Sequence, residues 1–336
     1  MSNHAKLQLV NLEIESQKKQ PLVSVIIPTY NRQLYLKEAI KSATQQTYQN
    51  IEIIVSDNCS PENPQALVES FQDSRIKFWR NSSNIGMLAN AMSAFQKAQG
   101  KYVASLNDDD AWNEDFLEKL VPILEANPNL SIAFCDHYIV DSDGKIDHSA
   151  TEANTRFWKR NQLKEGIYQP FWEIGLVHKA VTTAMAAVVR KDAVDWSCIP
   201  PEVGNMWDLY VTYICCRSGS GAYYYPERLT RYRVHGQSDT MLSGRKDVQV
   251  KIRNAKAEIF CNQLFMEDEQ LQEFKPYFRQ KWLHANTTAG IGLMRAREIA
   301  EARNYFRFVL SQQKLNLRNI VAYILSFTPQ WLANRF

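Results

Sequence analysis

Four short apolar segments alternate with helical patterns in the first third of the chain, and this alternation restricts the fold more than any other feature. The segments cover residues 23–27, 51–55, 76–79 and 102–106, and the first two are rich in Val and Ile. Between the first two, apolar residues recur at helical spacing, at Leu36, Ile40 and Ala43. Strands and helices that alternate at these lengths form right-handed crossovers. The sequence therefore predicts an α/β domain with a mostly parallel central sheet flanked by helices.

Each predicted strand leads into a polar loop, and the fourth loop is the most distinctive. The loops cover residues 29–32, 56–58, 81–86 and 107–110, and the last contains three consecutive carboxylates. Because ligands of open α/β sheets bind at the carboxyl ends of the strands, the four loops are expected to share one edge. Carboxylates there suit Mg²⁺ or Mn²⁺. The alternative is a solvated acidic turn that caps the helix beginning near Asn113.

Composition excludes several classes of protein. The chain has 39 basic and 36 acidic residues in 336, a balance that does not suit a nucleic-acid binder. Its six cysteines show no CxxC spacing, which favours reduced thiols and a cytoplasmic location, with the inner face of the cell membrane as a further candidate. No run of about 18 apolar residues is present to span a bilayer.

The remaining chain suggests a division into a tail, a large domain and a helical region. Residues 1–20 resemble a polar tail, 21–243 the α/β domain, and 244–336 a helical C-terminal region. Within the domain we expect strands in 131–140 and 222–225, the latter ending before Pro226, and a helix over 207–216. Residues 141–180 show no firm periodicity and are expected to form loops.

Five motifs along the chain resemble those of family 2 glycosyltransferases, in the order that family has them. They are VSVIIPTYNR at 23–32, IEIIVSDNCS at 51–60, NIG at 84–86 with Asn90, GKYVASLNDDDAW at 100–112, and WDL at 207–209 followed by YRVHGQS at 232–238. The resemblance implies the Rossmann-like fold called GT-A, with a helical C-terminal extension. It also implies a site for a nucleoside-diphosphate sugar.

The resemblance assigns nucleotide-sugar contacts to the first three loops. Thr29 and Tyr30 follow the first strand, and Asp57, which in the family bonds the base, follows the second. Asn84 would lie near the ribose or the phosphates. For Asp57 an Asx turn with Asn58 is an equally good interpretation.

The acidic run departs from the family pattern at its first position, where Asn107 replaces an aspartate. Asn107 can still bond a ribose hydroxyl, and Asp108 is assigned to the nucleotide sugar with it. Asp109 is the main candidate metal ligand and Asp110 a second. Asp108 with Asp110 is the alternative pair, and the sequence leaves the register open. Mg²⁺ or Mn²⁺ there would bridge the two phosphates.

Two further motifs supply candidate residues. His235 resembles a family position that contacts the metal or the diphosphate, and Arg233 one that contacts phosphate oxygens, although each also suits an ordinary structural role. Where the family commonly has an acidic pair before an apolar helix, this chain has Asn205 and Met206. Asp208 is therefore the candidate catalytic base, with a carboxylate favoured by the helix dipole as the alternative and Glu202 in reserve.

The segment 315–336 is apolar and aromatic and has no acidic residue. Ile320, Ile324 and Phe327 share one helical face. The segment is too short to span a membrane, so we expect either peripheral contact with the membrane interface or a helix packed on the protein or in a dimer.

Taken together, the residues and the resemblance imply a glycosyltransferase of the hexosyltransferase type. It would move a sugar from a nucleoside diphosphate, a UDP-sugar favoured, to a glycan or lipid-linked acceptor in bacterial cell-surface polysaccharide synthesis, in an inverting and metal-dependent reaction. The alternatives are a sugar-nucleotide-binding scaffold without turnover, and a sugar nucleotidyltransferase, which would need a glycine-rich phosphate loop. Donor sugar, acceptor, linkage and oligomeric state are encoded by no motif.

Overall fold

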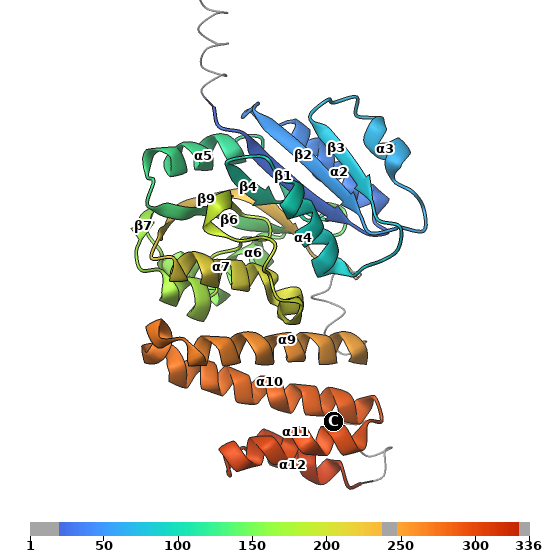
Figure 1. The fold of residues 1–336 in the computed structure, drawn as a ribbon, viewed down its shortest axis with the longest axis vertical. Helices are drawn as coiled ribbons and strands as arrows, with labels where there is room; N and C mark the ends of the chain where they lie inside the picture. The colour runs from blue at the N-terminus through green and yellow to red at the C-terminus, as the bar shows by residue number, and fades with distance from the viewer. Residues whose placement is uncertain (1–19, 237–246, 329–336) are drawn as a thin grey trace, which may run out of the picture. The chain divides into compact units, whose positions relative to one another are not determined.

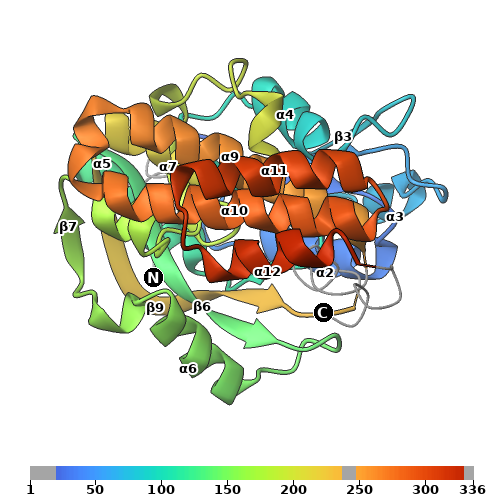
Figure 2. The same ribbon diagram turned by 90° about the horizontal axis from the view of Figure 1, so that it is seen from below.

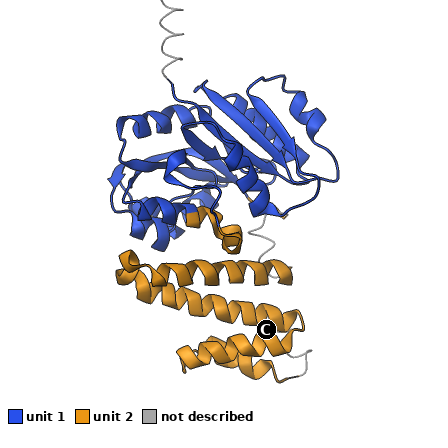
Figure 3. Ribbon diagram, in the orientation of Figure 1, with its two compact units in different colours: residues 1–199, 211–233 blue, residues 200–210, 234–336 orange. Residues whose placement is uncertain are grey.

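The computed structural model describes residues 20–236 and 247–328, and the chain divides into two compact units (Figure 3). The first comprises residues 1–199 and 211–233, and the second comprises 200–210 and 234–336. Of the predicted polar tail, residues 1–19 lie outside the described residues, as does the predicted domain boundary at 243/244.

A nine-stranded sheet forms the centre of the first unit (Figure 1). Its order is β3-β2-β1-β4-β8-β6-β9-β5, and β7 pairs with β9. The strands are β1 Val23–Thr29, β2 Ile51–Asp57, β3 Ile76–Arg80, β4 Tyr102–Ser105, β5 Ala111–Trp112, β6 Leu130–Val140, β7 Gly166–Tyr168, β8 Ala187–Arg190 and β9 Gly221–Arg233. The first four strands are parallel, whereas β5, β7 and β8 pair antiparallel with their neighbours. Strands β6 and β9 are also parallel to each other, over the longest pairing of the sheet. The predicted α/β class with a mostly parallel sheet is confirmed, with short antiparallel pairings at β5, β7 and β8.

Helices cover both faces of the parallel strands, and both faces are therefore apolar. The helices of this part of the chain are α2 Gln33–Thr44, α3 Gln65–Glu69, α4 Met87–Lys97, α5 Phe116–Ala126, α6 His148–Phe157 and α7 Trp207–Arg217. Val25 and Ile53 join the core formed with α2 and α5. Ile26 and Ile54 point the opposite way and are also fully buried. This packing fixes the strand ends that carry the polar loops.

Strand β9 runs past Pro226, where the sequence predicts its end. Its pairing partner β6 shifts register there, from Cys135 opposite Tyr225 to Asp136 opposite Arg228. The irregularity takes Pro226 out of the ladder, so its missing N–H costs no hydrogen bond. The strand therefore continues to Arg233.

Helix α6 lies in the region where loops were expected, and that expectation is wrong. Asp147 caps the helix by accepting a bond from the Ala150 N–H. The inward face of α6 carries Thr151 and Thr155 rather than apolar residues, so no hydrophobic period marks it. Thr155 donates to Asp136, and so does the fully buried guanidinium of Arg160 at 2.7 Å. A buried polar cluster, instead of an apolar stripe, attaches α6 to β6.

The described part of the second unit is helical, as the sequence predicts for 244–336. Its long helices are α9 Val248–Glu267, α10 Lys275–Arg295, α11 Ile299–Gln312 and α12 Leu317–Leu325, which Figure 2 shows side by side. Phe306 of α11 and Leu293 of α10 belong to its core. None of the helices among the described residues has the length and apolarity needed to cross a membrane. All six cysteines are free thiols, as their spacing indicates.

Candidate active site

Asp108 joins the acidic loop 107–110 to the loop after β1. Its carboxylate accepts bonds from the Thr29 hydroxyl at 2.7 Å and from the Tyr30 N–H at 3.3 Å. The Arg32 Nη1 atom lies 3.0 Å from an oxygen of Asp108 and 3.0 Å from an oxygen of Asp109. The carboxyl ends of β1 and β4, which are adjacent in the sheet, thus form one continuous polar site.

Asp110 contacts a different strand from Asp108: its carboxylate is hydrogen-bonded to the end of β9. One carboxylate oxygen accepts the backbone N–H of Arg233 at 2.9 Å, and the other accepts the Asn107 amide at 2.9 Å. The Arg233 side chain donates to the main-chain oxygens of Asp109 and Ser142 and forms an ion pair with Glu38. Arg233 is buried by these contacts, so binding phosphate would require it to give up protein acceptors. Its phosphate role stays a prediction.

Burial and mutual repulsion oppose full ionisation of the carboxylates in the acidic loop. Burial raises the pKa of Asp108 to about 6, and repulsion from Asp109 adds to this against the charge of Arg32. Burial and repulsion from Asp109 likewise raise the pKa of Asp110 well above its usual range. Asp109 is the most exposed of the three, at 8%. The site is therefore suited to receive a further cation beside Asp109.

The donor set fits Mg²⁺ or Mn²⁺, because these ions prefer carboxylate oxygens. The cationic nitrogen of Arg32, 3.0 Å from both Asp108 and Asp109, marks where positive charge is held between them. Among residues 20–236 and 247–328 no preformed group of three or more His, Cys, Asp or Glu side chains is arranged to hold a metal. Asp109 would hold the ion, whereas both oxygens of Asp108 and both oxygens of Asp110 already accept hydrogen bonds from protein groups.

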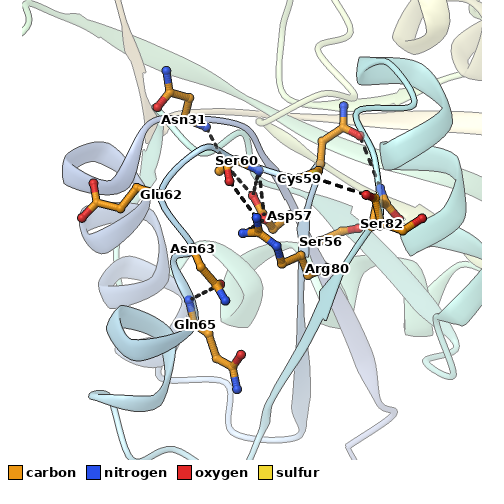
Figure 4. A network of polar contacts seen from close by, with 12 residues as sticks. Asn31, Ser56, Asp57, Cys59, Ser60, Glu62, Asn63, Gln65, Arg80 and Ser82 are labelled. Atoms are coloured by element: carbon orange, nitrogen blue, oxygen red, sulfur yellow. Dashed lines mark hydrogen bonds and ion pairs between the residues drawn. The ribbon is translucent and has the colours of Figure 1, made fainter.

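Asp57, the predicted base contact, is fully buried in a polar network of its own (Figure 4). Its carboxylate accepts the N–H and hydroxyl of Ser60 and a 2.8 Å bond from Arg80. Arg80 also donates to the Ser60 main-chain oxygen, and the Ser60 hydroxyl accepts the Asn31 N–H. These bonds reach Ser60, three residues after Asp57, and a base would compete with Ser60 and Arg80 for the carboxylate. The base contact stays a prediction.

Asn84 belongs to a network of amide side chains between β2 and α4. Its side-chain oxygen accepts the Asn58 amide at 2.9 Å and the Gly86 N–H at 3.0 Å. The Asn58 oxygen in turn accepts the Ile85 N–H. Gly86 has φ of +89°, a conformation that favours glycine, and it begins α4. These bonds fix the loop 84–86 at the same sheet edge and leave the Ile85 side chain exposed.

Asp208 and His235 belong to the second unit. Asp208 lies in the first turn of α7, directly after a stretch in which Gly204 has φ of +48°, and its carboxylate accepts the Leu209 N–H. His235 is buried and follows β9 by two residues. The assignments of Asp208 as base and His235 as metal ligand stay predictions.

The structure thus brings together Thr29, Tyr30 and the whole run 107–110 with Arg233, and it places Asp57 and Asn84 in neighbouring networks. Sequence reasoning missed two arginines, Arg32 and Arg80, each paired with a predicted site carboxylate. Arg32 stands inside the 23–32 motif, and an arginine at the end of one strand facing carboxylates at the end of the next was the available signal.

Solved structures share the fold of this chain. A TarS structure of S. aureus in complex with UDP-GlcNAc has a TM-score of 0.56 at 15% identity and covers 90% of each chain. The mannosyltransferase PcManGT of Pyrobaculum calidifontis, in complex with GDP-Man and Mn²⁺, has a TM-score of 0.55 at 16% identity, covering 95% of this chain and 94% of that one. At these identities the likeness shows the fold alone. The fold is that of GT-A glycosyltransferases.

Sequence comparison then gives the family. Residues 24–190 match the model described as glycosyl transferase family 2. The chain belongs to this family and is a glycosyltransferase, as the five motifs imply.

Curated relatives agree with that membership. An uncharacterized glycosyltransferase of Haemophilus influenzae is 28% identical over 73% of this chain and 76% of its own length. The putative colanic acid biosynthesis glycosyl transferase WcaA of Escherichia coli K12 is 40% identical over 46% of this chain and 59% of its own. The E. coli UDP-Glc:alpha-D-GlcNAc-diphosphoundecaprenol beta-1,3-glucosyltransferase WfgD is 34% identical over 37% and 49%. The chain thus spans only about half of the length of WcaA and of WfgD.

Proposed function

We propose that the chain transfers a sugar from a UDP-sugar to a glycan or lipid-linked acceptor, with inversion at the anomeric carbon, in cell-surface polysaccharide synthesis. The observation that carries the proposal is the cluster of three buried carboxylates at 108–110 beside the β1 loop, inside the family-matched region. The names of WcaA and WfgD support polysaccharide synthesis and a lipid-linked acceptor. UDP in the names of WfgD and of the TarS complex supports the donor.

In this proposal the first-unit residues bind and orient the donor. A divalent ion held by Asp109 would neutralise charge as the nucleoside diphosphate departs. Thr29 and the Tyr30 main chain keep Asp108 in place through their hydrogen bonds. Asn107 keeps its amide on Asp110 and leaves its oxygen as an acceptor for a ribose hydroxyl. The exposed ring of Tyr30 offers a surface against which a base can pack.

The acceptor hydroxyl must lose a proton as it attacks, and Asp208 is the proposed base. A carboxylate does this work when it lies within hydrogen-bond reach of the hydroxyl. Asp208 lies in the first turn of the apolar helix α7, close to positions 205 and 206, where the family commonly has its acidic pair. Glu202, in the preceding stretch, is exposed and remains the second candidate.

The test measures sugar-nucleotide hydrolysis and transfer with UDP-, GDP- and dTDP-sugars in the presence of Mn²⁺. We expect turnover with a UDP-sugar, and Asp109→Asn should lower it at least about 100-fold, because the ion that stabilises the departing charge loses its main ligand. Asp192→Asn, which removes an exposed carboxylate outside the site, is the matched control. Full metal-dependent activity in Asp109→Asn would refute the assignment of Asp109.

A scaffold without turnover is the second candidate function. It is favoured by Asn107, and by Asn205 and Met206 at positions where the family commonly has acids. Tight binding of a sugar nucleotide with neither hydrolysis nor transfer, even with acceptor extracts, would favour the scaffold over the transferase. A sugar nucleotidyltransferase is disfavoured, because the chain after β1 reads Tyr30-Asn31-Arg32 rather than a glycine-rich phosphate loop.

A further inference from the structure

Helix α12 turns its small and polar residues toward the protein. Asn319, fully buried, donates to the main-chain oxygen of Phe306 at 2.8 Å and accepts from the Thr287 hydroxyl at 3.2 Å. Ala322 and Ser326 follow on the same face and are also buried. Because a buried amide needs these specific partners, they determine which face of α12 packs on α10 and α11.

The opposite face of α12 is aliphatic and exposed. Leu317, Val321 and Ile324 stand at i, i+4 and i+7 and are 75%, 52% and 60% exposed. Leu315 before the helix and Phe327 after it extend this surface, whereas Ile320, which the sequence groups with Ile324 and Phe327, is half-buried. A surface helix of a globular protein normally buries such a stripe, so the inverted pattern indicates that the face contacts something else. We call these five residues, Leu315, Leu317, Val321, Ile324 and Phe327, the α12 apolar face.

Positive charge accompanies this face. From residue 302 to residue 336 the sequence has five basic residues and no acidic one, whereas the whole chain has a net charge of only +3. Arg307 and Lys314 are exposed. Arg303 lies 3.9 Å from the Phe327 ring centroid and donates to the Ser326 main-chain oxygen, which fixes the end of α12. An apolar stripe bordered by cations has the chemistry of a segment that lies in a membrane interface.

We propose that the α12 apolar face binds the surface of a bilayer that contains anionic lipids, with the helix axis in the plane of the membrane. A symmetric pairing of this face between two copies would bring together the cations that adjoin it, Arg303, Lys314 and Arg318, and the segment 302–336 has no acidic residue to compensate. Anionic headgroups supply that compensation. The proposal goes beyond the transfer reaction and needs no donor or acceptor to be correct.

The test is sedimentation of the full chain with vesicles of phosphatidylcholine alone or mixed with phosphatidylglycerol. We expect binding to the mixed vesicles, weakened by salt because the cations contribute. Leu317→Gln, Val321→Gln and Ile324→Gln combined should weaken binding at least tenfold. Glutamine is a good helix former and these positions are exposed, so α12 is retained. Circular dichroism checks that it is.

A matched control removes exposed apolar surface elsewhere. Phe157→Gln with Ile167→Gln changes two exposed residues of the first unit and should leave vesicle binding unchanged. The proposal is overturned if the unaltered chain ignores mixed vesicles, or if the triple variant binds them as well as the parent. It is also overturned if sedimentation equilibrium shows that the parent chain and the control variant are dimers and the triple variant is a monomer, because the α12 apolar face would then join two copies.

Discussion

Replacing Arg32 by glutamine tests how the acidic loop is held before any ion binds. Arg32 Nη1 lies 3.0 Å from oxygens of both Asp108 and Asp109, and its side chain is 24% exposed. A unit charge pair at that distance is worth about 5 kcal/mol at an effective dielectric of about 20. Exposure screens part of this, while removing one partner leaves buried carboxylates uncompensated. We therefore expect the free energy of unfolding to fall by about 2–3 kcal/mol.

Thermal unfolding followed by circular dichroism measures this loss. At about 2–4 °C per kcal/mol for a unit of 150–250 residues, the midpoint should fall by roughly 5–10 °C. Mn²⁺ should then raise the midpoint of Arg32→Gln more than that of the parent chain, because the ion supplies the missing positive charge without displacing an arginine.

The matched control is Arg75→Gln. Arg75 pairs with Asp73 and has a side chain 23% exposed, close to that of Arg32, but it lies outside the site. It should leave the response to Mn²⁺ at the parent level. Equal Mn²⁺ shifts in Arg32→Gln and the parent chain would refute the reasoning that Arg32 and the ion neutralise the same carboxylates.

Two further predictions concern a buried histidine and the candidate base. Burial and the charge of Arg160 lower the pKa of His137 to about 3. Between pH 6.5 and about 3, His137 is therefore protonated in the unfolded chain but neutral in the folded chain. The free energy of unfolding should accordingly fall by up to about 1.4 kcal/mol for each pH unit that the pH is lowered over this range. His137→Gln should flatten this slope in urea titrations, and parallel slopes would contradict the burial argument. For catalysis, Asp208→Asn should lower kcat about 100-fold or more with little change in donor affinity, while Glu202→Gln stays active. The reverse result would make Glu202 the base.

The sequence predicts the parallel half of the sheet well, because each strand there is a short apolar run that ends in a polar loop. It predicts the rest less well for identifiable reasons. β9 passes Pro226 through a register shift in its partner, which no local pattern signals. α6 is attached by Thr151, Thr155 and the buried Asp136 cluster, so its inward face has no hydrophobic period.

The candidate site shows a similar division. The acidic run and Thr29 meet as expected, because adjacent parallel strands end at one edge. The partners of Arg233 come from residues far along the chain, including Glu38 and Ser142. A linear motif does not contain that information. Side-chain partners across 90 residues or more follow from strand order, which the motifs do not specify.

The acidic loop also constrains the curvature of the sheet. β4 ends at Ser105 and β5 begins at Ala111, although β8, β6 and β9 lie between these strands in the sheet. In a flat sheet four strand spacings amount to about 19 Å, nearly the full reach of six extended Cα steps. The turn in which the Asp110 N–H binds the Asn107 oxygen shortens that reach. The sheet must therefore curl to bring β5 within range, so the length of this loop and the bend of the sheet cannot vary independently.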